Sequence, residues 1–165
     1  MSEAAGAACS AQEESVPGIT IRAARLDDES EALALIEELF VAPGRRPADY
    51  TRERAQEGFR RAVGKQQSDI LLAFDGQTPA GAATVYVDTY SIRYGLRCWV
   101  EDLVVLPSQR GVGVGKLLLD AAIDWGREHG CDFVQLHSGL GRKDAHRFYL
   151  SNGMEQDSLV FTKRL

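Results

Sequence analysis

Cysteine and histidine are scarce in this chain, and their spacing excludes the common sites built from them. The cysteines are Cys9, Cys98 and Cys131, and no two of them form a C-x-x-C pair. An odd number of widely spaced cysteines is neither a disulfide framework nor a zinc ribbon. The three histidines show no H-E-x-x-H spacing, so we expect no protein-bound metal.

Long apolar runs and an excess of basic residues are also missing. No run approaches the ~20 apolar residues that cross a bilayer, and residues 1–12 contain no lysine, no arginine and no apolar signal segment. Lysine and arginine number 19 against 24 aspartates and glutamates, which gives a net charge of −5. We therefore expect a cytoplasmic protein with reduced cysteines that binds neither nucleic acid nor a membrane.

The length of 165 residues suits a single globular domain. Residues 1–17 contain hardly any large apolar side chain, so their burial cannot offset the entropy lost on ordering. We predict a flexible tail over residues 1–17 and one folded domain over residues 18–165.

Hydrophobic periodicity divides this domain into alternating strands and helices. A first helix, capped by Asp27, Asp28 or Ser30, extends to Phe40. Further helices are predicted over residues 48–63, 113–128 and 144–151, and strands over residues 19–23, 70–74, 80–92, 96–106, 133–137 and 159–162. This order predicts an α/β architecture with an antiparallel front half and one parallel β-α-β crossover late in the chain.

A glycine-rich turn carries the clearest chemical signal. The segment from Arg110 to Gly115 reads R-G-V-G-V-G, follows a predicted strand and opens directly into a predicted helix. The free N–H groups of a helix N-terminus bind anions, and glycine lets a diphosphate approach the backbone. The segment matches neither G-x-x-x-x-G-K-[ST] nor G-x-G-x-x-G, because Arg110, Lys116 and Leu118 interrupt those patterns.

The remaining pattern, R-x-x-G-x-G, resembles the acyl-CoA-binding signature of the GCN5-related N-acetyltransferase (GNAT) superfamily. Residues 103–107 resemble the strand and proline that precede this signature. Residues 145–154 resemble the A-x-x-F-Y-x-x-x-G-F helix of the family, with Met154 in place of the final aromatic residue and Arg142 where asparagine is common. The resemblance covers residues 19–165.

This resemblance implies a mixed, mostly antiparallel sheet with about four helices and a splayed pair of parallel strands. The pantetheine of acetyl-CoA would pair with the strand backbone, and its diphosphate would rest on the glycine-rich turn without a metal. The implied cofactor-binding residues are Leu103, Val104, Val105, Arg110, Gly111, Val112, Gly113, Val114, Gly115, Lys116, His146 and Tyr149.

Acetyl transfer to an amine needs a proton acceptor, because a lysine-like ammonium has a pKa near ~10.4. The resemblance, which extends to polyamine acetyltransferases, places the general base at Glu101. Asp102, expected on the opposite strand face, is the alternative base. Tyr149 is the candidate acid towards the CoA sulfur, and the Val105 N–H is the candidate oxyanion donor. Each of these side chains also has a purely structural reading, and Phe148 is expected in the core.

The acceptor is expected over the first two helices and the strand at residues 80–92. An amphipathic pocket for a cationic amine could use Tyr86, Asp88, Tyr90 and Tyr94. A second group, Arg45, Arg46, Arg52 and Arg54, is either solvated surface charge or a site for an anionic group of the acceptor. Residues 142–165 also resemble aminoalkylphosphonate N-acetyltransferases, whose acceptors combine an amine with an anion.

Three functions follow from these patterns. The favoured one is an N-acetyltransferase that uses acetyl-CoA and acts on a primary amine of a small molecule by direct transfer. A protein lysine or N-terminal acetyltransferase and a non-catalytic CoA-binding module are the alternatives. A homodimer is also compatible with the sequence.

Overall fold

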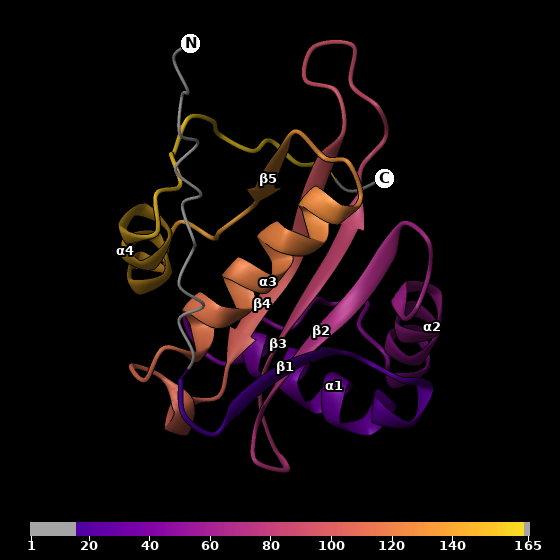
Figure 1. The fold of residues 1–165 in the computed structure, drawn as a ribbon, viewed down its shortest axis with the longest axis vertical. Coiled ribbons are helices and arrows are strands. Elements are labelled where there is room, and N and C mark those ends of the chain that lie inside the picture. The colour runs from indigo at the N-terminus through magenta and orange to yellow at the C-terminus, as the bar shows by residue number, and fades with distance from the viewer. Residues whose placement is uncertain (1–15, 164–165) are drawn as a thin grey trace, which may run out of the picture.

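In the computed structural model, which describes residues 16–163, one five-stranded sheet has the order β1-β2-β3-β4-β5 (Figure 1). The first four strands, β1 (Ile19–Ala23), β2 (Ser68–Asp75), β3 (Thr78–Val87) and β4 (Arg97–Val105), are antiparallel neighbours. The last, β5 (Phe133–Leu136), runs parallel to β4. The mixed sheet with one late parallel crossover is therefore confirmed.

The four α-helices are α1 (Glu29–Glu37), α2 (Arg52–Ala62), α3 (Val114–Glu128) and α4 (Lys143–Ser151). Short 3₁₀ turns, η1 (Leu26–Asp28), η2 (Glu38–Phe40) and η3 (Pro107–Gln109), flank α1 and precede α3. None of the helices among residues 16–163 is long and apolar enough to cross a membrane. Within the same part of the chain, no group of three histidine, cysteine, aspartate or glutamate side chains could hold a metal ion.

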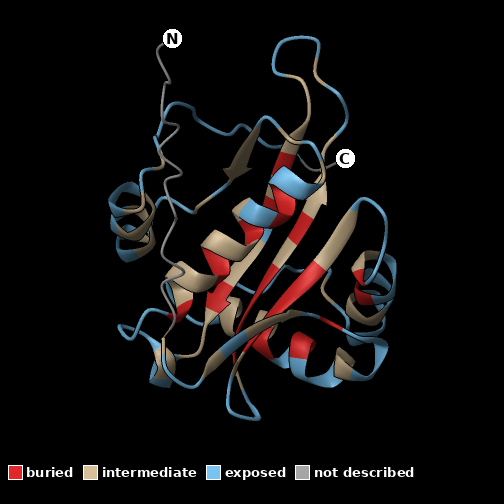
Figure 2. Cartoon of the chain, in the orientation of Figure 1, coloured by how far each residue is buried: buried red, intermediate tan, exposed pale blue. Residues whose placement is uncertain are grey.

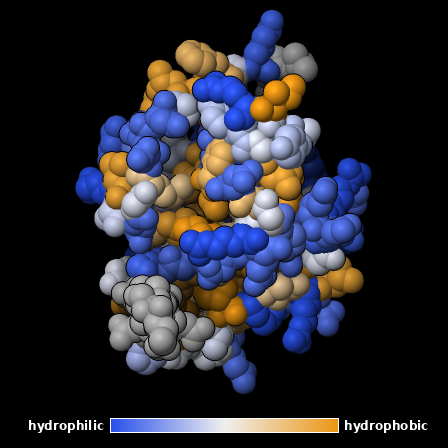
Figure 3. Space-filling view, turned by 45° about the horizontal axis from the view of Figure 1, so that its top comes forward, coloured by the Kyte–Doolittle hydropathy of each residue, from blue (hydrophilic) through white to orange (hydrophobic). Residues whose placement is uncertain are grey.

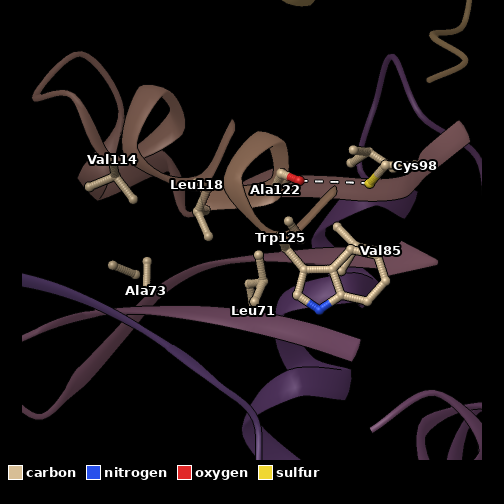
Figure 4. Close-up of a cluster of buried hydrophobic side chains, with 11 residues drawn as sticks. Leu71, Ala73, Val85, Cys98, Val114, Leu118, Ala122 and Trp125 are labelled. Carbon is tan, nitrogen blue, oxygen red and sulfur yellow. Dashed lines mark hydrogen bonds between the residues drawn. The ribbon is translucent and has the colours of Figure 1, made fainter. Parts of the chain in front are cut away.

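Two hydrophobic clusters cover the two faces of the sheet. Leu71 and Ala73 of β2 pack with α3, whereas Ile70 and Leu72 pack with α1 and α2. Alternate residues of one strand thus serve opposite clusters, as the two-residue period of a strand requires. Buried residues lie along the strands and on the inner side of α3 (Figure 2). Figure 4 shows Leu118 and its neighbours in the α3 cluster.

Two element boundaries differ by four residues or more from the sequence-based predictions. Helix α2 begins at Arg52 rather than at residue 48, because the Thr51 hydroxyl accepts a hydrogen bond from the Arg54 N–H at 3.2 Å and caps the helix there. Strand β3 ends at Val87 rather than at residue 92. Beyond Val87 the strand does not continue. The Asp88 carboxylate pairs with Arg97 and accepts a hydrogen bond from the Thr89 N–H.

The strand predicted over residues 159–162 is wrong. These residues form no strand, and β5 is the edge of the sheet. Leu159, Val160 and Phe161 are 70%, 50% and 90% exposed. An apolar run becomes a strand only where the edge of a sheet supplies partners for its backbone hydrogen bonds. The edge strand here, β5, is four residues long and offers few such partners. The tail predicted over residues 1–17 lies almost entirely outside the described residues.

Candidate active site

The parallel strands β4 and β5 separate halfway along β4. Only Arg97–Val100 pair with β5, so residues 101–105 have no strand neighbour on that side. The Leu106 N–H donates to the Ala80 carbonyl on the β3 side, at 2.9 Å. Because N–H groups alternate in direction along a strand, the N–H and C=O of Val105 face the open side. The splayed pair is therefore confirmed, and its open edge can pair with an amide-bearing ligand.

A cavity of about 650 Å³ lies along this open edge. Four parts of the chain meet around it: the end of β4, the turn before α3, the start of α4 and the loop after η2. It is lined by Glu38, Leu39, Val41, Ala42, Pro43, Leu103, Val104, Val105, Pro107, Arg110, Gly111, Gly113, Gly115, Lys116, Gly141, Arg142, Lys143, Asp144, Ala145, Phe148 and Tyr149. The face of the molecule in Figure 3 carries hydrophilic and hydrophobic residues side by side.

The turn before α3 forms an anion cradle at one end of the cavity. Gly111 and Gly113 have φ angles of 80° and 96°, left-handed values that glycine adopts readily. Gly113 is the N-cap of α3 and offers no side-chain cap, so the first N–H groups of α3 have no helical partner. The Arg110 Nε donates to the Val105 carbonyl at 3.1 Å, and Lys116 pairs with Asp120 at 2.9 Å. Partial positive charge and two cations therefore favour a diphosphate here.

Gly115 sets the gap between α3 and α4. A Cβ at this position would lie 3.5 Å from the Phe148 ring and 3.6 Å from a Val105 methyl, which is ordinary contact. Phe148 was expected in the core, and this expectation is wrong. Helix α4 has no buried residue, and Phe148 instead lines the cavity against Gly115.

One face of α4 supplies the far wall of the cavity. Ala145, Phe148 and Tyr149, at positions i, i+3 and i+4, all line it, as the helical spacing predicts. Burial raises the pKa of the Tyr149 hydroxyl, and the Arg142 charge opposes this shift. The Arg142 guanidinium also donates to the Leu39 carbonyl at 2.7 Å, which ties the start of α4 to η2.

Three predicted cofactor-binding residues do not line the cavity with their side chains. Val114 is fully buried in the α3 cluster, and Val112 is 53% exposed. His146 lies on α4, where its Nε2 contacts the Gly139 carbonyl at 3.0 Å. Only the backbone of the two valines belongs to the anion cradle.

Neither of the two candidate bases lines the cavity; they come directly before the lining residue Leu103 in β4, at a β-bulge that the sequence did not reveal. Asp102 pairs with Thr84 and Val100 pairs with Val85, so Glu101 is an extra residue in β4. Val100 consequently belongs to the α3 cluster and Val104 to the α1 cluster. In a regular strand these two residues would share a face.

The bulge overturns the expectation that Asp102 points to the strand face opposite Glu101. Side chains at positions 84 and 86 of β3 share one face, and Thr84 hydrogen-bonds to Asp102 whereas Tyr86 hydrogen-bonds to Glu101. The two carboxylates therefore lie on the same face. A bulge places two consecutive residues opposite one, which is how neighbours come to share a side.

Their environments differ strongly. Asp102 is half-buried, and burial together with the Glu101 charge raises its pKa to about 6, against the opposing hydrogen bond from Thr84. Glu101 is exposed and accepts a 2.9 Å hydrogen bond from the Trp99 indole N–H. Burial and the Glu101 charge also raise the pKa of Tyr86 to about 12. Sequence reasoning missed Thr84 and Trp99, because both become relevant only through the bulge.

The residues suggested for the acceptor do not form one pocket. The ring centroids of Tyr86 and Trp99 are 6.4 Å apart, but Tyr90 is 70% exposed and Tyr94 packs on Phe133. Of the arginines, Arg52 and Arg54 pair with Glu37 and Asp49. Arg46 lies over the rings of Phe40 and Tyr50, at 5.9 Å and 4.8 Å. Three of the four arginines thus already have partners on the loop and helices around them.

The family model of the Acetyltransferase (GNAT) family matches residues 33–154 of the chain. Aminoalkylphosphonate N-acetyltransferase of Salmonella typhimurium is 30% identical over 154 residues, which cover 93% of this chain and 96% of that protein. The uncharacterized N-acetyltransferase YhdJ of Bacillus subtilis is 42% identical over 100 residues, 60% of this chain and 70% of that protein.

Solved structures share the fold at lower identity. Aminoglycoside N-acetyltransferase AAC(6')-Iy in complex with CoA has a TM-score of 0.77 and 18% identity, over 89% of this chain and 94% of that chain. At this identity the likeness shows the arrangement of strands and helices alone.

Proposed function

Since the chain belongs to the acetyltransferase (GNAT) family and is an acetyl-CoA-dependent N-acetyltransferase, we propose that its acceptor is the primary amine of a small molecule. The observation that carries this proposal is the 30% identity with an aminoalkylphosphonate N-acetyltransferase across 93% of the chain. A likeness of that extent includes η2 and the loop after it, which line the cavity beside the cofactor site.

The cavity fits acetyl-CoA in its donor groups and its charge. Acetyl-CoA supplies the reactive acetyl thioester. On the open edge, the backbone of Leu103 and the N–H of Val105 pair with amides, whereas the Val104 carbonyl faces Gly81 of β3. The cradle from Arg110 to Lys116 binds phosphate oxygens through N–H groups and cations. Val112 and Val114 contribute backbone N–H groups only. His146 contributes least, because its ring is already in contact with the Gly139 carbonyl.

Three groups of the chain serve the reaction, two by transferring a proton and one by stabilising negative charge. A carboxylate of the β4 bulge, Glu101 or its neighbour Asp102, takes the proton from the acceptor ammonium. The Val105 N–H, which faces the open edge, stabilises the negative charge that develops on the carbonyl oxygen. The Tyr149 hydroxyl, which lines the same cavity, delivers a proton to the sulfur as it leaves.

A panel of amines tests the acceptor class. The purified protein and acetyl-CoA are mixed with aminoalkylphosphonates, polyamines, aminoglycosides and lysine peptides, and release of the free thiol is followed. We expect turnover with a small amine, with the aminoalkylphosphonates as the first candidates. Turnover with the peptides alone would assign the protein acceptor instead, and release with none of the amines would contradict the proposal.

Replacing Tyr149 by phenylalanine tests the acid. This change removes a hydroxyl without altering the shape of the cavity wall, so acetyl-CoA affinity should persist while kcat falls ~10²-fold. Tyr90→Phe is the matched control, because Tyr90 is 70% exposed on a loop. Equal turnover of both variants would remove Tyr149 from the mechanism and leave the rest of the proposal standing.

A further inference from the structure

The bulge at Glu101 places two neighbouring carboxylates on the same face of the sheet. Without the extra residue, Glu101 and Asp102 would point to opposite faces of the sheet and be separated by the backbone. With it, the charge of Glu101 acts directly on Asp102. The negative charge of Glu101 makes ionisation of the neighbouring Asp102 less favourable.

Each member of the pair is fixed by a different strand neighbour. Thr84 lies opposite Asp102 in the register of β3 and β4 and donates a hydrogen bond to its carboxylate. Trp99 donates to Glu101 at 2.9 Å, and Tyr86 also hydrogen-bonds to Glu101. Asp102 is therefore held in a half-buried position, and Glu101 is held at the surface.

The surrounding elements present few charges to this pair. From β3 come Tyr86 and, further along, Asp88, which is paired with Arg97. Beyond β4, His137 follows β5 and packs against the Trp99 ring at 4.4 Å. From α1 come mainly the apolar residues Ala32, Leu33 and Leu35, while Glu37 is engaged by Tyr50 and Arg52 and Glu38 lines the cavity. The charge that raises the pKa of Asp102 is that of Glu101.

We propose that Glu101 and Asp102 act as one coupled proton acceptor for the incoming amine, and that Thr84 is the positioning residue that holds Asp102 in this pair. The proposal rests on the acetyltransferase function proposed above. An N–H bond of the acceptor ammonium breaks, and an O–H bond forms on the carboxylate pair. The neutral amine is then free to attack, and the exposed Glu101 returns the proton to water.

The physical advantage of the pair lies in its working range. A lone exposed glutamate has a pKa near ~4.3 and is a weak base at neutral pH. A base is most effective when its pKa approaches the working pH. Burial and the neighbouring Glu101 charge raise the pKa of Asp102 to about 6, and the hydrogen bond from Thr84 limits this rise.

Two substitutions should move this titration in opposite directions. Glu101→Gln removes the neighbouring charge, so the Asp102 pKa should fall, by about one unit. Thr84→Val keeps the branched shape but removes the hydroxyl that stabilises the carboxylate, so the Asp102 pKa should rise, by about half a unit to one unit. Thr84→Ser retains a hydroxyl and should keep the titration of the unchanged protein.

The titration is measured by carbon NMR on protein labelled at the aspartate carboxyl carbons, with the Asp102 signal identified by its loss in Asp102→Asn. The acidic limb of kcat/KM against pH is recorded for the same variants with the best amine of the panel. We expect the limb to follow the NMR midpoints: lower in Glu101→Gln, higher in Thr84→Val and unchanged in Thr84→Ser. Circular dichroism establishes that each variant is folded.

Equal midpoints in Glu101→Gln and the unchanged protein would overturn the coupling, and an unmoved midpoint in Thr84→Val would overturn the role of Thr84. A wild-type limb in Asp102→Asn together with a lost limb in Glu101→Gln would assign the base to Glu101 alone and leave the proposed function intact. Absence of turnover with every amine would refute the proposed function, whereas the NMR titration, which needs no acceptor, would still decide the coupling.

Discussion

The two halves of β4 show how one strand serves both the fold and the site. Residues Arg97–Val100 have a strand neighbour on each side, and Cys98 and Val100 are fully buried under α3. Residues 101–105 have a strand neighbour only on the β3 side, and they contain both carboxylates of the bulge. Where the backbone is paired on both sides, side chains are left to build a core. Where it is paired on one side, backbone groups remain available to a ligand.

Helices α3 and α4 differ in the same way. Both line the cavity, but α3 packs Val114, Leu118 and Ala122 into the core, whereas α4 has no buried residue. Helix α3 is therefore held by burial of apolar surface, and the start of α4 is tied to η2 by the hydrogen bond from Arg142 to Leu39. The rigid wall carries the anion cradle, and the less buried wall carries Tyr149.

The largest effect is expected from Gly115→Leu, which changes the gap between these two walls. The space at Gly115 accepts a Cβ but lies directly against Phe148 and Val105, so a longer side chain must extend into the cavity. Loss of two charge-assisted hydrogen bonds to the diphosphate should cost roughly 3–6 kcal/mol, or about 10²–10⁴-fold in acetyl-CoA affinity. Calorimetric titration measures this loss.

Gly58→Ala on α2 is the matched control, because nothing lies within 4 Å of a Cβ there. Its acetyl-CoA affinity should equal that of the unchanged protein. Affinity should also be the same with and without EDTA, since N–H groups, Arg110 and Lys116 supply the positive charge of the cradle. Retained affinity in Gly115→Leu would show that the diphosphate binds elsewhere.

Leu118→Ala tests the claim that α3 is fixed by burial. Leu118 is 0% exposed and sits in the cluster between α3 and the sheet. Truncating a leucine in such a position should lower the free energy of unfolding by ~3 kcal/mol, through lost burial and the cavity left behind. Leu150→Ala on α4 is the counterpart, because Leu150 is 54% exposed and should cost less than ~1 kcal/mol. Urea unfolding of both variants measures the contrast, and equal losses would remove it.

The sequence predicts the core-forming parts of this molecule well. Apolar periodicity located α3, β2 and β5 to within a few residues, because burial dictates which positions must be apolar. The glycine pattern located the anion cradle for a similar reason. Gly111 and Gly113 adopt left-handed conformations that other residues rarely take, so the backbone itself requires glycine there.

Features that depend on pairing between distant segments were not predictable in this way. The bulge at Glu101 arises from the register of β4 against β3, and no local pattern in β4 reports it. The failed strand at residues 159–162 has the same origin, because a run such as Leu159–Phe161 reads as a strand whether or not an edge accepts it. The core position predicted for Phe148 is wrong for a similar reason. Helical spacing determines which residues share a face of α4, but not what that face packs against.

Asp102→Asn separates stability from activity at the bulge. In the folded protein the pKa of Asp102 is about 6, above its ordinary value of 3.8, so the folded state binds this proton more tightly than the unfolded state does. Stability is therefore lost as pH rises from about 4 through about 6, and the loss persists above that range. Asparagine does not ionise, so the variant should be more stable than the unchanged protein at pH 7.5, by ~3 kcal/mol, and equally stable at pH 3.5.

Urea unfolding at pH 3.5, 5 and 7.5 measures this dependence. Asp124→Asn is the control, because Asp124 is an exposed partner of Arg127 on α3 and should show no comparable gain. We expect Asp102→Asn to lose acetyl transfer at the pH where it gains stability. A variant less stable than the unchanged protein at pH 7.5 would mean that Asp102 contributes to the fold rather than to the site.

The smallest effect is expected from Thr51→Ala, in the part of the molecule that serves only the fold. The Thr51 hydroxyl accepts the Arg54 N–H at 3.2 Å and caps α2, which contributes Phe59 to the α1 cluster but no residue to the cavity lining. Losing this cap should cost ~1 kcal/mol of stability and leave kcat/KM unchanged. Thr51→Ser keeps the hydroxyl and should retain most of the stability. A fall in kcat/KM under conditions where the variant is still folded would show that α2 shapes the acceptor side of the site. The site would then include residues beyond those that line the cavity.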